Sequence, residues 1–165
     1  HKMKEISVLF GEAQIAAGAD VLTFPDHATG DLVSGAYYRD FLMELHQEMA
    51  ERLNAPLILH ICGSTADRLD YIARSGMACF HFDSKNDHQE VMDIAARRSR
   101  LGGNLNNPGR VYARRHAGGR EADDRYIESG VDMSGRECAI HLGRKHEKLV
   151  EIKKAVGAWG KKKDD

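Results

Sequence analysis

Residues 56–83, PLILHICGSTADRLDYIARSGMACFHFD, decide the fold class of this 165-residue chain. The apolar runs at 56–62 and 78–83 are typical of buried strands. The segment between them reads as an amphipathic helix, with Thr65 as a candidate N-cap and Gly76 as its terminator. A strand, a helix and another strand in this order predict two parallel strands joined by a crossover.

The same alternation runs along the rest of the chain. Further strands are expected at 20–24, 100–105 and 131–135, and further helices at 2–20, 34–53, 87–98, 122–130 and 144–160. Three helix ends read alike, AAGAD, RSGMA and ESGVD, and each places glycine directly before an apolar strand. The pattern predicts an α/β fold with about five parallel strands and outer helices. An open doubly wound sheet and part of a (β/α)8 barrel both fit, because a closed barrel needs eight strands and about 250 residues.

Two of the expected helices carry enough apolar residues to predict a buried face. In the first helix these residues are Ile6, Leu9, Phe10 and Ile15. In the second, which has Ser34 as a candidate N-cap, they are Tyr38, Phe41, Leu42, Leu45 and Met49. We expect both faces to pack on the sheet.

Composition limits the classes of function. The chain has 24 Lys and Arg against 25 Asp and Glu, so we expect neither nucleic acid nor an anionic membrane surface as a partner. The arginine-rich stretch at 110–125 and the terminal KKKDD are interpreted as solvated surface. No apolar stretch approaches the roughly 20 residues of a membrane helix and no signal peptide precedes the first helix, so a cytoplasmic protein is expected. Three cysteines in a reducing compartment favour core residues, ligands or nucleophiles over a disulfide framework.

Two neighbouring strands turn ionisable side chains to one interior face. Because side chains alternate along a strand, His60 and Cys62 point away from the aliphatic face of residues 57–61. The strand at 78–83 divides in the same way into one face with Phe80 and Phe82 and an opposite face with Cys79, His81 and Asp83. The polar groups lie toward the carboxyl ends of the strands, where parallel α/β folds place their sites.

Each of these residues also has a structural interpretation. A histidine on a strand is most often a satisfied structural residue, and a lone H-x-C pair occurs often by chance. Cys79 lies early in its strand and is favoured as a small buried hydrophobe. Asp83 precedes the turn SKND, where it could cap the following helix instead of serving a site.

Cys138 makes a metal site the favoured interpretation of the H-x-C pair. It follows the last strand at that strand's carboxyl end, so His60, Cys62 and Cys138 are expected to emerge on one rim. Two thiolates and one imidazole with a position left open are typical of a catalytic zinc site. Glu137, beside Cys138, could add an oxygen ligand or face solvent, and solvent is slightly favoured.

Five segments occur in the order expected of a known superfamily. They are AQIAAGADVLTFPD, PLILHICGSTADRLDYIARSG, FHFDSKNDHQEVMDI, LGGNLNNP and SGVDMSGRECAI. Through them the chain resembles the uroporphyrinogen decarboxylase superfamily, most closely its methylcobalamin:coenzyme M methyltransferases and related corrinoid-dependent methyltransferases. The resemblance implies a partial (β/α)8 TIM barrel, with residues 1–165 as a single domain that corresponds to the C-terminal half of the family barrel. The start HKM could include added residues, with Met3 as the native start.

The resemblance also implies a reaction. Members of this branch hold zinc with an H-x-C pair and a distant cysteine, which match His60, Cys62 and Cys138 in type, order and separation. The implied reaction moves a methyl group from methylcobalamin, carried by a partner corrinoid protein, to a small thiol such as coenzyme M. Zinc, Zn2+, would prepare the thiol by lowering its pKa.

Four further residues are implied around the zinc, and two other functions stay open. Asp83 and His81 are candidate catalytic residues, and Asp26 and Asn104 are candidate substrate-binding residues at strand ends. A tetrapyrrole decarboxylase, as elsewhere in the superfamily, would need no metal. A non-catalytic half-barrel could pair with itself or with another chain. Because five strands without closure leave two unpaired edges, a homo-oligomer through exposed sheet edges is expected.

Overall fold

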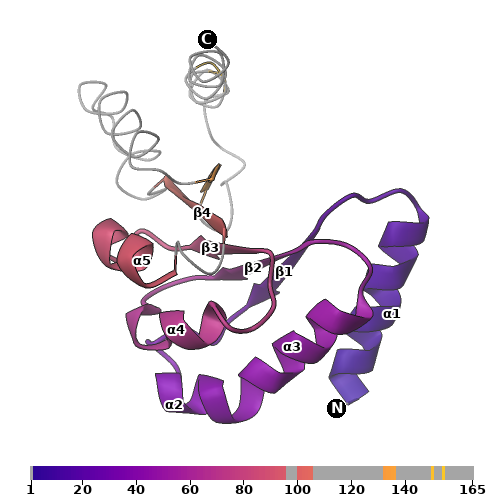
Figure 1. Cartoon of the computed structure of the whole chain (residues 1–165), viewed down its shortest axis with the longest axis horizontal. Coiled ribbons are helices and arrows are strands. Elements are labelled where there is room, and N and C mark those ends of the chain that lie inside the picture. The colour runs from indigo at the N-terminus through magenta and orange to yellow at the C-terminus, as the bar shows by residue number, and fades with distance from the viewer. Residues whose placement is uncertain (1, 96–99, 106–131, 137–149, 151–153, 155–165) are drawn as a thin grey trace, which may run out of the picture.

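Five parallel strands form the sheet of the computed structural model, which describes residues 2–95, 100–105, 132–136, 150 and 154 (Figure 1). The strands are β1 (Leu22–Asp26), β2 (Leu57–Ile61), β3 (Cys79–Phe82), β4 (Arg100–Leu105) and β5 (Met133–Arg136). They lie side by side in chain order, and each neighbouring pair is parallel. The predicted α/β fold with five parallel strands is confirmed.

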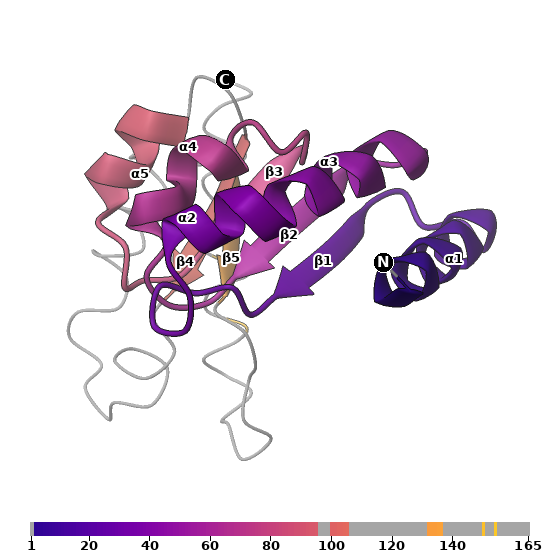
Figure 2. The same ribbon diagram turned by 90° about the horizontal axis from the view of Figure 1, so that it is seen from below.

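Helices precede and connect the strands. α1 (Lys2–Ala16) precedes β1. Between β1 and β2 lie α2 (Gly35–Tyr37), the π-helical turn η1 (Tyr38–Leu42) and α3 (Met43–Arg52). The 3-10 turn η2 (Ala66–Arg68) and α4 (Leu69–Ile72) connect β2 to β3, and α5 (His88–Ala95) follows β3. Figure 2 shows α2, α3, α4 and α5 on one face of the sheet, with α1 beside β1. Among the described helices none is both long and apolar enough to cross a bilayer. The helix expected at 122–130, and nearly all of the one expected at 144–160, lie outside the described residues.

The core lies between the sheet and the helices that cover it. Its large apolar side chains that are at most 1% exposed include Leu59, Ile61, Phe80, Phe82 and Leu101 from the sheet and Tyr38, Leu69, Ile72 and Val91 from the helices. The register sets Leu59 beside Phe80 and Ile61 beside Phe82, so the apolar faces of β2 and β3 form one continuous layer. Burying each such side chain contributes about 1.5–3 kcal/mol. This layer leaves His60 and His81 for the opposite face of the sheet.

The predicted buried face of α1 is wrong for three of its four residues. Ile6, Leu9 and Phe10 are 60%, 62% and 66% exposed, and only Ile15 packs against the core. The helix instead buries the side that carries Gly11, where an added Cβ would lie 3.0 Å from the nearest core side chain. α1 therefore has two apolar faces, and the described residues cover one of them.

The helix expected at 34–53 is confirmed in position but changes its helical phase. Ser34 caps it as predicted, because Ser34 Oγ accepts a hydrogen bond from Tyr37 N at 3.2 Å. The π-helical turn η1 then widens one turn and rotates the residues that follow. Tyr38 and Met49 are buried as predicted, whereas Phe41, predicted to lie on the same face, is 60% exposed and His46 is buried.

Candidate functional site

His60 on β2 and His81 on β3 lie side by side on the sheet face opposite the helices. They are partners in the parallel register, and their ring centroids are 4.6 Å apart. His60 Nδ1 lies 3.0 Å from the carbonyl oxygen of His81 and 2.6 Å from His81 Nδ1. The side chains are 7% and 9% exposed. The structure thus brings together two of the residues expected on the interior face.

Cys62 directly follows β2 and lies beside His60. Its Sγ is 3.1 Å from His60 Nε2. The nitrogen and sulfur ligands of a tetrahedral zinc ion are about 3.6 Å apart, so a small shift would let both atoms bind one ion. The third predicted ligand, Cys138, lies outside the described residues. Within the part of the chain that the structure describes, no group of three or more His, Cys, Asp and Glu side chains is placed to hold a metal ion.

Burial keeps two ionisable groups of this face uncharged at neutral pH. Burial lowers the pKa of His81 to about 4, and the neighbouring His60 acts in the same direction against the opposing charge of Asp83. Burial also raises the pKa of the Cys79 thiol to about 11, with Asp132 adding to the increase. His81 is therefore a neutral imidazole and Cys79 a protonated thiol, which agrees with the prediction that Cys79 is a small buried core residue.

Asp83 follows β3 and joins it to the loop after β2. Its Oδ2 accepts a hydrogen bond from Gly63 N at 2.9 Å, and its Oδ1 accepts one from Lys85 N at 2.9 Å. Both carboxylate oxygens thus hold backbone N–H groups of loops that border the site. These contacts do not cap the following helix as predicted, because Asp87 Oδ1 accepts the hydrogen bond from Glu90 N in the first turn of α5. Asp83 instead stabilises the two loops, and a catalytic role for it stays a prediction.

Asn86 is a buried residue that the sequence pattern did not single out. Its Oδ1 accepts hydrogen bonds from Thr65 N at 2.7 Å and Thr65 Oγ1 at 3.0 Å. Its Nδ2 donates to Gly63 O at 3.0 Å and to Asp83 O at 2.8 Å. The Thr65 side chain, predicted to cap the helix, makes no cap bond and uses its hydroxyl here. One amide therefore links the loops after β2 and β3 and fixes the residue next to Cys62.

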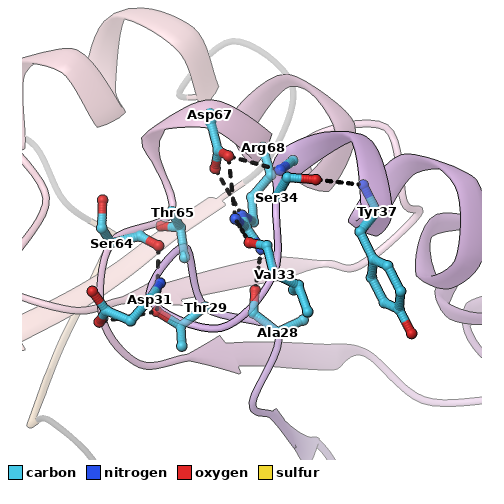
Figure 3. Close-up of polar contacts among 12 residues, drawn as sticks. Ala28, Thr29, Asp31, Val33, Ser34, Tyr37, Ser64, Thr65, Asp67 and Arg68 are labelled. Carbon is cyan, nitrogen blue, oxygen red and sulfur yellow. Dashed lines mark hydrogen bonds and ion pairs between the residues drawn. The ribbon is translucent and has the colours of Figure 1, made fainter.

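Arg68 holds the loop after β1 against the start of η2 (Figure 3). Its side chain is fully buried, and its guanidinium donates to the carbonyl oxygens of Ala28 and Val33 and to the Asp67 carboxylate. Asp67 Oδ2 also accepts a hydrogen bond from Gly35 N at 2.7 Å. The three loops at the carboxyl ends of β1, β2 and β3 are thereby joined by buried polar side chains, which lack the apolar periodicity that sequence analysis can detect.

The loops meet so closely that two positions require glycine. A Cβ at Gly35 would lie 2.4 Å from Asp67 O. A Cβ at Gly63, whose φ is +75°, would lie 2.2 Å from Thr29 Oγ1. Side chains at either position would separate the loops that frame Cys62.

Asp26 ends β1, but the structure does not bring it together with His60 and His81. It pairs in register with a core residue of β2, and its Oδ2 is 3.0 Å from Nε2 of the buried His46. His46 Nδ1 in turn is 2.8 Å from the hydroxyl of Tyr38. Burial raises the pKa of Asp26, but the contact with His46 and backbone hydrogen bonds outweigh this effect and hold that pKa below its usual value. Asp26 thus belongs to a hydrogen-bonded chain under the helices, and substrate binding by it stays a prediction.

Asn104 lies in β4 and pairs in register with Gly135 of β5. Two residues earlier on the same strand, Gly102 pairs with His81. Strand alternation therefore puts position 104 on the sheet face of His81. Contact of Asn104 with substrate stays a prediction.

Comparison with known protein families gives a match over most of the chain. The model described as Uroporphyrinogen decarboxylase (URO-D) matches residues 1–158. The chain belongs to the URO-D family. The His60 and His81 pair, the Cys62 loop and the polar residues that hold this loop are therefore parts of a URO-D fold.

Relatives of this URO-D chain include methyltransferases of Methanosarcina. The chain is 33% identical over 158 residues to a methylated-thiol--coenzyme M methyltransferase of Methanosarcina mazei, covering 86% of this chain and 39% of that protein. It is 28% identical over 138 residues to a methylcobamide:CoM methyltransferase of Methanosarcina barkeri, covering 82% of this chain and 41% of that protein.

A solved methyltransferase structure from Methanosarcina mazei matches the fold with a TM-score of 0.85 at 26% identity, over 96% of this chain and 47% of that chain. The predicted partial barrel of the URO-D family is thereby confirmed. The chain spans less than half the length of each of these relatives. That residues 1–165 form a single domain stays a prediction.

Proposed function

We propose that this chain supplies the zinc-binding part of an enzyme that transfers a methyl group to a small thiol. The observation that carries the proposal is the convergence of His60 Nε2 and Cys62 Sγ, 3.1 Å apart, at the carboxyl end of a URO-D strand. The names of two relatives, which specify a methylated thiol or a methylcobamide together with coenzyme M, support the substrate class. The acceptor is a thiol such as coenzyme M, and the donor is methylcobalamin held by a corrinoid protein.

The proposed ligands are His60, Cys62 and Cys138, with one position left for the thiol. Zinc held by these residues would supply the charge that lowers the pKa of the acceptor thiol and favours its thiolate form. The chain's own groups prepare this position. Burial excludes water from the face around His60, and the hydrogen bonds of Asn86 fix the backbone next to Cys62. Because these residues make up less than half of a family barrel, we propose the reaction for the complete barrel to which they belong.

Cys62→Ser is expected to lose zinc, and this result tests the proposal. The wild-type chain should bind about one zinc ion, and replacing a thiolate ligand by a hydroxyl should lower the affinity on the order of 100-fold or more. Metal analysis and competition with a chromophoric chelator measure both quantities. Cys79→Ser is the matched control, because Cys79 is a buried thiol on the neighbouring strand. Wild-type chain without zinc would contradict the proposed function, and full affinity in Cys62→Ser would contradict the ligand set.

Decarboxylation of a tetrapyrrole is the second candidate, because the matching family model carries that name. It requires no metal. Turnover of a tetrapyrrole by zinc-free protein would favour it over methyl transfer.

We also propose that the chain associates with a second copy through the uncovered face of α1. Ile6, Leu9 and Phe10 are at least 60% exposed on this face, and contiguous apolar side chains of this kind are typical of interfaces. The adjacent edge of β1 is less suited to pairing. Leu22 N donates a hydrogen bond to Pro56 O, directly before β2. The backbone N–H groups of successive residues in a strand point to opposite sides, so the nitrogen of Pro25 faces the open edge of β1. Proline has no N–H, so this position cannot donate to an added strand. The helix face, more than the strand edge, is therefore the proposed contact.

Phe10→Glu is expected to convert associated chains to monomers. A carboxylate at the centre of an apolar contact would have to lose its hydration, which should weaken association about 10-fold or more. Sedimentation velocity over a range of concentrations measures the change. Asn54→Asp, which adds the same charge at an exposed position outside α1, is the control. A monomeric wild-type chain at all concentrations would contradict the proposed contact.

A further inference from the structure

The proton between His60 and His81 can be placed from the geometry of the pair. His60 Nδ1 has two close neighbours, the carbonyl oxygen of His81 at 3.0 Å and His81 Nδ1 at 2.6 Å. A carbonyl oxygen only accepts hydrogen bonds, so the proton is on His60 Nδ1. Without it, lone pairs would face each other in a buried site, which is costly.

His81 must then carry its own proton on the other ring nitrogen. Its Nδ1 faces the N–H of His60 and can only accept, because two N–H groups at 2.6 Å would repel. Every imidazole ring carries at least one N–H proton, and with Nδ1 accepting this proton is on Nε2. In the described part of the chain, His81 Nε2 is buried and has no hydrogen-bond partner.

A buried N–H group without a partner calls for an explanation, because leaving it unsatisfied is unfavourable. His81 is buried, with 9% of the residue exposed. It is held on its Nδ1 side by His60, and its Cδ2 edge lies over Gly102, where a Cβ would be only 3.6 Å away. The ring is thus fixed with its Nε2–H on the sheet face that also carries the Cys62 end of β2.

We propose that His81 Nε2–H donates a hydrogen bond to an anionic atom of the bound methyl acceptor. The proposal rests on the proposed function and adds a substrate-contacting residue to the same site. An anion is the favoured partner because a charged acceptor strengthens a hydrogen bond in a buried site. The thiolate sulfur and an acidic group at the other end of the thiol offer the same chemistry, and the choice of probes below distinguishes them.

Two substitutions of His81 separate this donor from the rest of the ring. His81→Asn keeps an acceptor near the position of Nδ1 but lacks a group at Nε2, whereas the longer amide of His81→Gln can place an N–H there. In the zinc-loaded full chain, the Kd for 2-mercaptoethanesulfonate should rise about 10-fold in His81→Asn and should stay within about 3-fold of wild type in His81→Gln. The Kd for zinc should change less than about 3-fold in both, because the backbone carbonyl oxygen of residue 81 remains to accept the hydrogen bond from His60 Nδ1. Calorimetric titration measures these affinities.

Two probes then identify the bonded atom. The loss in His81→Asn should persist with 2-mercaptoethanol if the sulfur is bonded, and with ethanesulfonate if the acidic group is bonded. Equal affinity of wild type and His81→Asn for all three probes would overturn the proposal.

A measurement on wild-type protein keeps the proposal testable if the variants fail to fold. Long-range proton–nitrogen correlation spectra of histidine-labelled chain should place the protons on Nδ1 of His60 and Nε2 of His81. A proton on His81 Nδ1 would overturn the proposal. Failure of the proposed function would appear separately, as absence of zinc from the wild-type chain.

Discussion

Arg68→Ala is expected to lower the free energy of unfolding by about 3–5 kcal/mol. The Arg68 side chain is 0% exposed and is among the largest fully buried side chains of the described residues. Its removal leaves the carbonyl oxygens of Ala28 and Val33 without their donors and opens a cavity in a packed region. Urea unfolding followed by circular dichroism measures the change.

Two further arginine substitutions show which property of Arg68 is responsible. Arg68→Lys keeps the positive charge, but a single ammonium cannot match the fork that reaches two carbonyl oxygens and Asp67. We expect a loss of about 1.5–3 kcal/mol. Arg74→Ala is the control, because Arg74 forms an exposed ion pair with Asp70 and should cost less than about 1 kcal/mol. A loss in Arg68→Ala no larger than in this control would show that the buried guanidinium does not hold the loop.

The strands could be predicted closely because buried strands leave a local signal in the sequence. β4 spans the predicted residues 100–105, and β2 lies within the predicted 56–62. Two strands are shifted: β5 was expected at 131–135 and runs from Met133 to Arg136, and β1 was expected at 20–24 and runs from Leu22 to Asp26. Pro25 reads as a strand end in the sequence, but at the edge of the sheet its missing N–H faces the open side and the strand continues through it.

The buried faces of the helices could be predicted only in part. α1 has apolar residues on two sides, and periodicity alone does not say which side meets the sheet. The deciding residue, Gly11, has no apolar side chain to mark its face. The second helix contains the π-helical turn η1, which shifts the helical phase of the side chains. An apolar repeat of 3.6 residues does not predict such a turn.

The same holds for the site: residues marked by a local sequence pattern were predicted, and residues held by contacts distant in the chain were missed. The alternation of side chains correctly put His60 and His81 on one face, because it depends only on neighbouring positions. Arg68 and Asn86 were missed because most of their partners are backbone atoms, many of them 21–40 residues away in the chain. Backbone groups are present at every position, so no residue type marks where such partners will lie.

Asn86→Ala is expected to lower the free energy of unfolding by about 2–4 kcal/mol. All four hydrogen bonds of its side chain would be lost. Gly63 O and Thr65 N, in the loop after β2, would then lack the hydrogen bonds that join them to the loop after β3. Asn54→Ala is the matched control, because Asn54 is exposed and should change stability by no more than about 0.5 kcal/mol. Equal urea midpoints for Asn86→Ala and the control would contradict the role of this amide.

Asn86→Ala should also weaken zinc binding, which distinguishes it from Arg68→Ala. The Asn86 amide binds Gly63, the residue directly after Cys62, so its loss frees the backbone that aims the proposed Cys62 ligand. Groups that orient a metal ligand typically contribute about 10-fold or more to affinity. Arg68 instead holds the loop after β1, and the zinc affinity of its folded fraction should stay within about 3-fold of wild type. Chelator competition at a temperature where both variants are folded compares them. Equal zinc affinities would mean that Asn86 stabilises the loops without positioning Cys62.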